Sequence, residues 1–313
     1  MLNTSVKPFV CVIGGLNIDL QGSSDRPLVF NDSNPGEIAM SAGGVGRNIA
    51  ENIAKLNIHS KILSYVGADP LGEFVIEKSE KSGVDTSLLK KDNHLPTSQY
   101  LSLLDDNNDM LVSISDMRII DEMTIQDINN WDEVISQSSV IIVDANIPIL
   151  VIEYITNKYS KIPLFLDPVS YAKTSKIIKL IGRFHTVKPN RLEAELISGL
   201  KITDKDSMLK SAKIIFNMGC KQVFITLGSE GVFYYDGNDY GQYLFEGADV
   251  ISANGAGDAF TAGVVYGFLK LKSIKESAEF ASAAAVIALR SLNTISDDMS
   301  EERVKLLLKE EKP

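Results

Sequence analysis

The sequence predicts an α/β fold with three layers, in which a central, mostly parallel sheet has helices on both faces and carries a small β lid. Through most of the 313 residues, short apolar runs rich in β-branched residues alternate with longer segments of helical period. Such alternation is typical of parallel strands joined by crossover helices that cover both faces of the sheet. No linker, internal repeat or low-complexity tract interrupts it, so we expect one domain over residues 1–313.

The predicted elements follow one another in a regular order. In the first part of the chain we expect a strand in FVCVIGG (9–15), a helix in GVGRNIAENIAKL (44–56), a strand in KILSYVG (61–67) and a helix in PLGEFVIEKSEKSG (70–83). Later strands are expected in VIIVDA (140–145), IPLFLDP (162–168), FHTVKPN (184–190) and KQVFITLG (221–228), with helix-length segments between them.

Two segments do not fit a strand-helix unit. Residues 97–115 read as two strands about the polar turn DDNND, and residues 16–38 are polar and punctuated by glycine and proline without helical period. We expect them to form a small β lid, over about 16–41 and 95–118, above the carboxyl edge of the sheet. Open α/β sheets bind their ligands at that edge.

Composition favours a small ligand over a large anionic partner. The formal net charge of −10 argues against nucleic acid and against an anionic membrane surface, since both carry the same sign. Cys11 and Cys220 each lie in an apolar run without a zinc spacing, which indicates reduced core thiols. No signal pattern is present and no window approaches the about 20 apolar residues of a membrane helix, so we expect a cytoplasmic protein.

The stretch SANGAGDAFTAG (252–263) places a carboxylate in a glycine-rich turn that opens a helix. The amides of such a turn and the helix dipole together favour a bound anion such as a phosphate. Asp258 would repel that anion unless it had a task of its own, such as accepting a proton from an attacking hydroxyl during phosphoryl transfer. The alternative is that Asp258 only caps the helix and the glycines only allow a tight turn.

Three further groups suit a polyol and a metal ion. Asn17 and Asp19 follow the first strand in GGLNID, and Gly43, Gly44 and Asn48 open a helix in SAGGVGRN. Amide and carboxylate groups can bind adjacent hydroxyls, and glycine allows close backbone approach, although turn chemistry and capping explain each segment alone.

The third group, Asn190 and Glu193 in TVKPNRLEAE, has a spacing that puts both side chains on one helical face. There they could hold Mg²⁺ directly or through water, or simply form a capping box.

Taken in order, the motifs GGLNID, SAGGVGRN, KPNRLEAE, TLGSEG and NGAGDAF resemble those of the ribokinase-like (PfkB) family of carbohydrate and nucleoside kinases. The resemblance implies a ribokinase-like αβα fold, ATP and Mg²⁺ as cofactors, and phosphoryl transfer to a hydroxyl under a closing lid. Asp258 matches the catalytic base of the family, and the N–H groups of Gly255, Ala256 and Gly257 match its anion hole.

Further site residues are implied by the same resemblance. The positions that match sugar-binding residues are Asn17, Asp19, Gly43, Gly44, Asn48 and Asn146. The positions that match the Mg–ATP and nucleotide site are Asn190, Glu193, Thr226, Leu227, Gly228, Gly231 and Ser282. Where many members have an acidic residue followed by threonine to help bind K⁺, this chain has Ser252 and Ala253, which argues against activation by K⁺.

Within the family, this chain is most similar to the branch that phosphorylates the 5′-hydroxyl of pseudouridine. The segments that carry this similarity are DSNPGEI, AGGVGRNIAENIAKL, TSQYLSLLDDNNDMLVSISDM, LFLDPVS and HTVKPNRLEAE. The candidates for recognising the base are Thr97, Ser98, Tyr100, Ser115 and Asp116 in the lid, with Lys173 reaching either the base or a phosphate. Taken one at a time, the lid residues could equally be strand residues that face solvent, and Lys173 could be a surface lysine. The alternatives are another acceptor, such as ribose, a ketohexose or a purine nucleoside, or a member that only binds nucleosides. Exposed lid strands could also pair across a homodimer.

Overall fold

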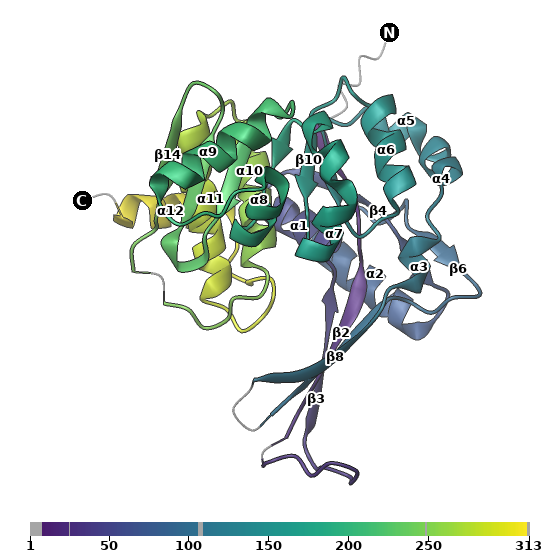
Figure 1. The fold of residues 1–313 in the computed structure, drawn as a ribbon. Coiled ribbons are helices and arrows are strands. Elements are labelled where there is room, and N and C mark those ends of the chain that lie inside the picture. The colour runs from purple at the N-terminus through teal and green to yellow at the C-terminus, as the bar shows by residue number, and fades with distance from the viewer. Residues whose placement is uncertain (1–7, 25, 106–108, 248, 312–313) are drawn as a thin grey trace.

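The centre of the protein is a sheet of eight strands (Figure 1). This computed structural model describes residues 8–24, 26–105, 109–247 and 249–311. The strands lie in the order β14 (Tyr240–Tyr243), β13 (Val232–Tyr235), β12 (Gln222–Thr226), β11 (Thr186–Val187), β10 (Leu164–Asp167), β9 (Val140–Asp144), β1 (Phe9–Ile13) and β4 (His59–Leu63). Pairing is parallel from β12 to β4, and β13 is antiparallel to both neighbours.

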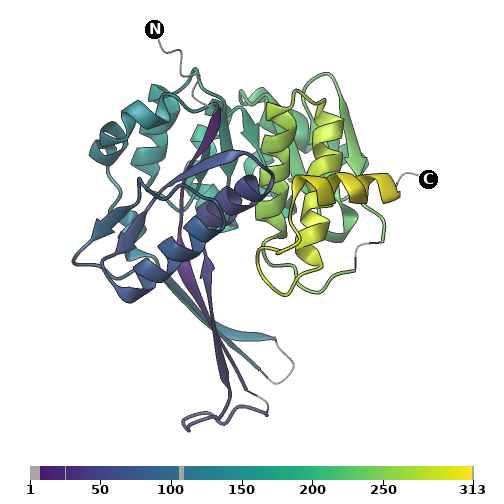
Figure 2. The same ribbon diagram turned by 180° about the vertical axis from the view of Figure 1, so that it is seen from behind.

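Helices cover both faces of this sheet, which gives three layers (Figures 1 and 2). One face carries α1 (Val45–Lys55), α2 (Pro70–Lys81), α10 (Ala256–Leu269), α11 (Ile274–Leu289) and α12 (Glu301–Glu311). The other carries α3 (Arg118–Asp121), α4 (Ile125–Asn130), α5 (Asp132–Ile135), α6 (Ile149–Lys158), α7 (Tyr171–Ile177), the 3-10 helix η1 (Ile178–Arg183), α8 (Arg191–Ser198) and α9 (Lys205–Asn217). The predicted fold class is confirmed.

The two cores follow from alternation along fully buried strands. In β9, Val140 and Ile142 pack beneath α1 and α10, whereas Ile141 and Val143 pack against the helices of the opposite face. Cys11 in β1 lies in the second core and is buried, as predicted. Within the described part of the chain, no helix is both long enough and apolar enough to cross a membrane.

The two segments that do not fit the strand-helix pattern form a second sheet, which projects from the body of the protein (Figures 1 and 2). We call it the lid sheet. Its strands lie in the order β3 (Glu37–Gly43), β2 (Asn17–Ser23), β7 (Gln99–Leu104) and β8 (Met110–Asp116). Residues 106–108 of the predicted DDNND turn lie outside the described residues.

The register gives the lid sheet two different faces. On the polar face, Asp19 pairs with Ser41 and Tyr100, and Tyr100 pairs with Ser115. The apolar face holds the residues between them, and its members are Leu20, Ile38, Met40, Leu101, Leu103, Val112 and Ile114. One face of this sheet is therefore suited to hydroxyl groups and the other to an apolar partner.

Two predicted strands differ in extent from the observed ones. KILSYVG is divided, because β4 ends at Leu63 and the chain then leaves the main sheet to form β5 (Tyr65–Gly67), which pairs with β6 (Lys90–Asp92). The strand predicted in FHTVKPN is limited to Thr186–Val187. Pro189 has no N–H to donate to a ladder, and Asn190 already caps α8.

Candidate active site

The candidate site is built where neighbouring strands of the main sheet end. Asp144 is the last residue of β9 and Asp167 the last of β10, and the two pair in register. Lys188 follows β11, the next strand. Burial raises the pKa of Asp144 to about 6, even though the backbone N–H groups of Gly15 and Asn146 donate to its carboxylate at 2.7 and 2.8 Å. Parallel pairing thus gathers two carboxylates and an ammonium at one edge of the sheet.

The glycine-rich turn opens α10 as the sequence predicts. Gly255 has φ +75°, and a Cβ there would lie 1.8 Å from the carbonyl oxygen of Thr294, so only glycine fits. The helix begins at Ala256, and the N–H groups of a first helical turn have no acceptor within their own helix. The start of α10 therefore offers the amides of Ala256 and Gly257 to an anion.

Asp258 lies in this first turn and is half-buried. Its Oδ2 accepts a hydrogen bond of 2.9 Å from Asn48 Nδ2 on α1. Burial and the nearby Asp167 carboxylate raise the pKa of Asp258 to about 8, although Asn48 and Lys188 act in the opposite direction. A carboxylate with a pKa close to neutral is suited to accepting a proton from a hydroxyl.

Lys188 belongs to this site, although its sequence context did not single it out. It is only 9% exposed, and its Nζ lies 3.2 Å from Asp167 Oδ2. The Thr261 hydroxyl lies 3.1 Å from the same oxygen and 3.0 Å from the carbonyl oxygen of Gly257, so its single proton is shared between these two acceptors. A Cβ on Gly257 would lie 3.5 Å from Lys188 Nζ, so the ammonium lies beside the proposed anion hole.

The predicted sugar-binding residues meet at the base of the lid sheet. Asn17 Nδ2 donates to Asp19 Oδ1 at 2.6 Å, and burial raises the pKa of Asp19. A Cβ on Gly43 would lie 2.1 Å from Asp19 Oδ2, and Gly44 has φ +100°. Gly43 is therefore required by the close approach of Asp19 on β2, and Gly44 by its positive φ and the close approach of α1 to the β1–β2 connection.

Asn146 lies near the same connection. It follows β9, and a Cβ on Gly15 would come within 3.0 Å of its Nδ2. The side chain of Asn146 thus lies against the backbone that leads into β2.

Asn190 and Glu193 form a reciprocal capping box at the start of α8, which is one of the two arrangements expected from their spacing. Asn190 Oδ1 accepts from the Glu193 N–H at 2.9 Å, and Glu193 Oε2 accepts from the Asn190 N–H at 2.8 Å. Burial raises the pKa of Glu193, and Lys188 opposes this shift.

The capping box does not exclude a metal, because the bond from Oε2 leaves Oε1 for a ligand. A single carboxylate oxygen suits Mg²⁺ that is otherwise bound by water and phosphate oxygens. No group of three or more His, Cys, Asp and Glu side chains within the described ranges could hold a metal by itself.

The predicted nucleotide loop follows β12. The Thr226 N–H donates to the carbonyl of Pro189 at 3.0 Å, which ties the loop to the start of α8. Leu227 is buried, and the 3-10 helix η2 (Gly228–Glu230) follows. Gly228 has φ +62° and Gly231 has φ +82°. A Cβ on Gly231 would lie 2.1 Å from the carbonyl oxygen of Tyr243. Ser282 is buried on α11.

The lid candidates separate into two groups. Ser98 precedes β7 by one residue, so alternation places it with Tyr100 and Ser115 on the polar face, and its buried hydroxyl has no hydrogen-bond partner. Ser98 is therefore oriented to the same side as Asp19, and its hydroxyl makes no hydrogen bond within the protein.

Thr97, Asp116 and Lys173 do not join that group. The Thr97 hydroxyl donates to Asp69 Oδ1 at 2.8 Å and accepts from the Gly67 N–H at 3.0 Å, so it is already satisfied. Asp116 forms an ion pair of 2.7 Å with Arg118, and its register places it opposite to the polar face. Lys173 is half-buried on α7.

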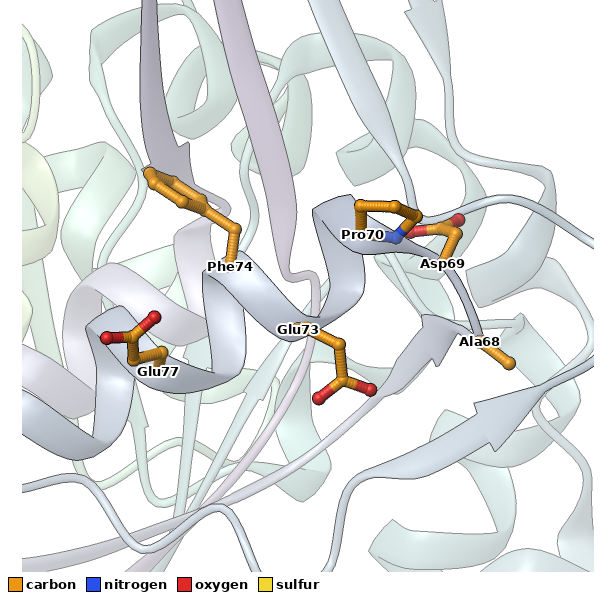
Figure 3. A pocket seen from close by; sticks show the side chains of 6 residues that line it. All are labelled: Ala68, Asp69, Pro70, Glu73, Phe74 and Glu77. Carbon is orange, nitrogen blue, oxygen red and sulfur yellow. The ribbon is translucent and has the colours of Figure 1, made fainter.

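A hollow of about 560 Å³ lies at the start of α2, where Asp69, the partner of Thr97, is one of its lining residues (Figure 3). Phe74 and Glu73 point to different sides of the helix in that view. The residues that line the hollow are Ala68, Asp69, Pro70, Glu73, Phe74 and Glu77. None of the predicted site residues lines it.

Known proteins resemble this chain over nearly its whole length. Residues 7–302 match the pfkB family carbohydrate kinases. Pseudouridine kinase of Escherichia coli K12 is 37% identical over 94% of this chain and 94% of its own, and the uncharacterised sugar kinase YeiI of the same organism is 33% identical over 93% and 82%. The crystal structure of a putative sugar kinase from Clostridium perfringens has a TM-score of 0.89 and 34% identity over 97% of this chain and 96% of its own.

Proposed function

The chain belongs to the pfkB family of carbohydrate kinases and is a phosphotransferase that acts on a sugar or nucleoside hydroxyl, and we propose that its acceptor is the 5′-hydroxyl of pseudouridine. The observation that carries the proposal is the position of Asp258 at the amide-lined start of α10, within hydrogen-bonding distance of Asn48. The 37% identity to a pseudouridine kinase supports the choice of acceptor.

In this proposal Asp258 is the general base. Its carboxylate accepts the proton of the acceptor hydroxyl as that oxygen attacks the γ-phosphorus of ATP, and the bond between that phosphorus and the β,γ-bridging oxygen breaks to leave ADP. The N–H groups of Gly255, Ala256 and Gly257 would stabilise the charge on the transferring group. The raised pKa of Asp258 matches a base that works near neutral pH.

Kinases of this family use ATP with a divalent metal. We assign Asn190 and Glu193 to that metal, which we propose to be Mg²⁺, and Thr226, Leu227, Gly228, Gly231 and Ser282 to the nucleotide. When bound, the metal would neutralise phosphate charge and orient the triphosphate. The link between Thr226 and Pro189 supports this assignment, because it holds the loop after β12 against the start of α8.

The polar face of the lid sheet supports a nucleoside acceptor. Asn17 and Asp19 would bind the ribose hydroxyls together with Gly43, Gly44, Asn48 and Asn146. The Ser98 hydroxyl, which is buried without a partner, and Tyr100 would bind the base edge. Thr97, Asp116 and Lys173 complete the proposed set of base-recognition residues; Thr97 and Asp116 are bound to Asp69 and Arg118 in this structure.

A second acceptor is favoured by the similarity to the sugar kinase YeiI. Under this alternative the same residues phosphorylate another sugar or nucleoside. ADP release measured with pseudouridine, uridine, adenosine, ribose and fructose decides between them. The proposal predicts the highest kcat/KM with pseudouridine, and turnover of a free sugar without turnover of pseudouridine would contradict it.

We also propose that a second copy of the chain covers the apolar face of the lid sheet. Ile38 is 81% exposed and Ile114 is 64% exposed, and both lie on that face. Apolar side chains aligned on one side of a projecting sheet favour burial against a like surface. The polar face would remain available to the acceptor.

A further inference from the structure

Asp167 and Lys188 form a buried ion pair, which the proposed acid-base chemistry uses only through its effect on the pKa of Asp258. Lys188 and Arg47 are the two described cations that are less than a tenth exposed, and Arg47 is bound to Glu51 on its own helix. Lys188 instead lies beside the catalytic turn. Burying an ammonium is costly unless it is paired, and an apolar pair would fill the same space at lower cost. Its position therefore calls for a functional explanation.

The geometry directs the ammonium toward the start of α10. Asp167 Oδ2 forms an ion pair of 3.2 Å with Lys188 Nζ, and it accepts a hydrogen bond of 3.1 Å from the Thr261 hydroxyl. Thr261 lies one helical turn after Gly257 and bonds to the carbonyl of that residue. One carboxylate oxygen thus joins the lysine to the helix whose first amides would hold the phosphoryl group.

We propose that Asp167 is a positioning residue for phosphoryl transfer, whose carboxylate holds the Lys188 ammonium beside Gly257 so that the ammonium contacts the transferring phosphoryl group. The proposal rests on the kinase activity and on Asp258 as its base. Phosphoryl transfer spreads negative charge over the equatorial oxygens of the moving group, and a fixed cation beside the amides would stabilise that charge without reorganisation. Lys188 is then a catalytic residue, whereas Asp167 acts through it.

The test compares Asp167→Asn with Lys188→Met, using the acceptor that the wild-type chain phosphorylates fastest in the panel above. Failure of the pseudouridine proposal therefore leaves a measurable rate. We expect each variant to lower kcat by about 10²–10³-fold, the range for loss of one preorganised electrostatic contact, with an unchanged KM for the acceptor. Lys188→Arg, which keeps the charge, should recover part of the loss.

The pH profile separates a positioning role from a merely structural one. Asp258 is faced by Asp167 and Asp144 at the ends of β10 and β9, by Lys188 after β11 and by Asn48 on α1. Removing the negative charge of Asp167 lowers the pKa of Asp258, so the acidic limb of kcat/KM moves to lower pH. Removing the positive charge of Lys188 raises that pKa and moves the limb to higher pH.

The matched control is the half-buried ion pair of Lys61 and Asp85, far along the sheet from the site. Lys61→Met and Asp85→Asn should leave kcat and the pH profile as in the wild type. Thermal unfolding identifies variants that fold, and if Asp167→Asn does not fold, the Lys188→Met and Lys188→Arg pair decides. Two results would overturn the proposal. One is a folded Asp167→Asn variant with the wild-type kcat, and the other is a Lys188→Met variant in which the acidic limb of kcat/KM does not move to higher pH.

Discussion

Asn48 on α1 donates a hydrogen bond of 2.9 Å from its Nδ2 to Oδ2 of Asp258 on α10, although 210 residues separate the two in the chain. Asn48 Oδ1 in turn accepts from Arg47 Nη1 at 3.3 Å, which fixes the orientation of the amide. The contact joins a proposed acceptor-binding residue to the proposed base. The first turn of each helix therefore contributes to one reaction centre.

We predict that Asn48→Ala moves the acidic limb of kcat/KM to higher pH. The Asn48 amide lowers the pKa of Asp258 by stabilising its ionised form, so loss of the donor raises that pKa. In the wild-type free enzyme, kcat/KM should fall as the pH drops through about 8. The rates are measured between pH 5 and pH 10. A wild-type limb near pH 4, the ordinary range of a carboxyl group, would show that Asp258 is not shifted.

We predict that Gly43→Ala weakens acceptor binding more than it lowers the turnover number. The new Cβ would lie 2.1 Å from Asp19 Oδ2, so the carboxylate must move away from its position beside Asn17. Steady-state kinetics should show KM for the acceptor raised by about tenfold or more, which corresponds to a binding loss of about 1.4 kcal/mol. Ala39→Ser on the same strand is the control, and an equal effect in both variants would remove the special role of Gly43.

We predict that the chain forms a dimer through the apolar face of the lid sheet, and that a single charged residue on this face dissociates the dimer. Ile114→Lys places an ammonium on the apolar face, where burying it in an interface is costly, and sedimentation should show a monomer where the wild type is a dimer. Ser113→Lys is the matched control, because this neighbour points to the opposite face of the same strand. A wild-type monomer at micromolar concentration would refute the proposed second copy.

Sodium and potassium buffers should give nearly equal rates. Ser252 and Ala253 stand where an acidic residue and threonine would help to bind K⁺, and the Ser252 hydroxyl accepts from the Asn254 N–H at 3.3 Å. Without that carboxylate, the loop has one negative charge fewer to attract a monovalent cation. We expect kcat to differ by less than about twofold between the two salts at equal ionic strength. A large stimulation by K⁺ alone would contradict this.

The layers of the fold and the catalytic turn could be predicted because each depends on local pattern. The β-branched run of VIIVDA and the amphipathic GVGRNIAENIAKL specify a strand and a helix by their own periodicity. Gly255 could be placed in a turn because only glycine adopts its backbone conformation without strain.

The partners of the site residues could not be predicted in the same way. Asp167 ends β10 and Lys188 directly follows the neighbouring β11, so the sequence held a signal for both, but their pairing depends on strand order. Likewise, Thr97 is a polar residue two positions before β7, and only the structure shows that Asp69 already binds it. Contacts between distant segments depend on packing that composition and spacing do not encode.

The measurement that tests the central claim most directly is the comparison of Asp258→Asn with the wild type in both ligand binding and turnover. Asparagine keeps the size of the side chain but cannot accept the proton of a hydroxyl. We predict that acceptor and nucleotide affinities, measured by calorimetry, stay within a few-fold of wild type while kcat falls by about 10²–10⁴-fold. A variant that folds, binds both ligands and keeps the wild-type kcat would contradict the role of Asp258 as the base.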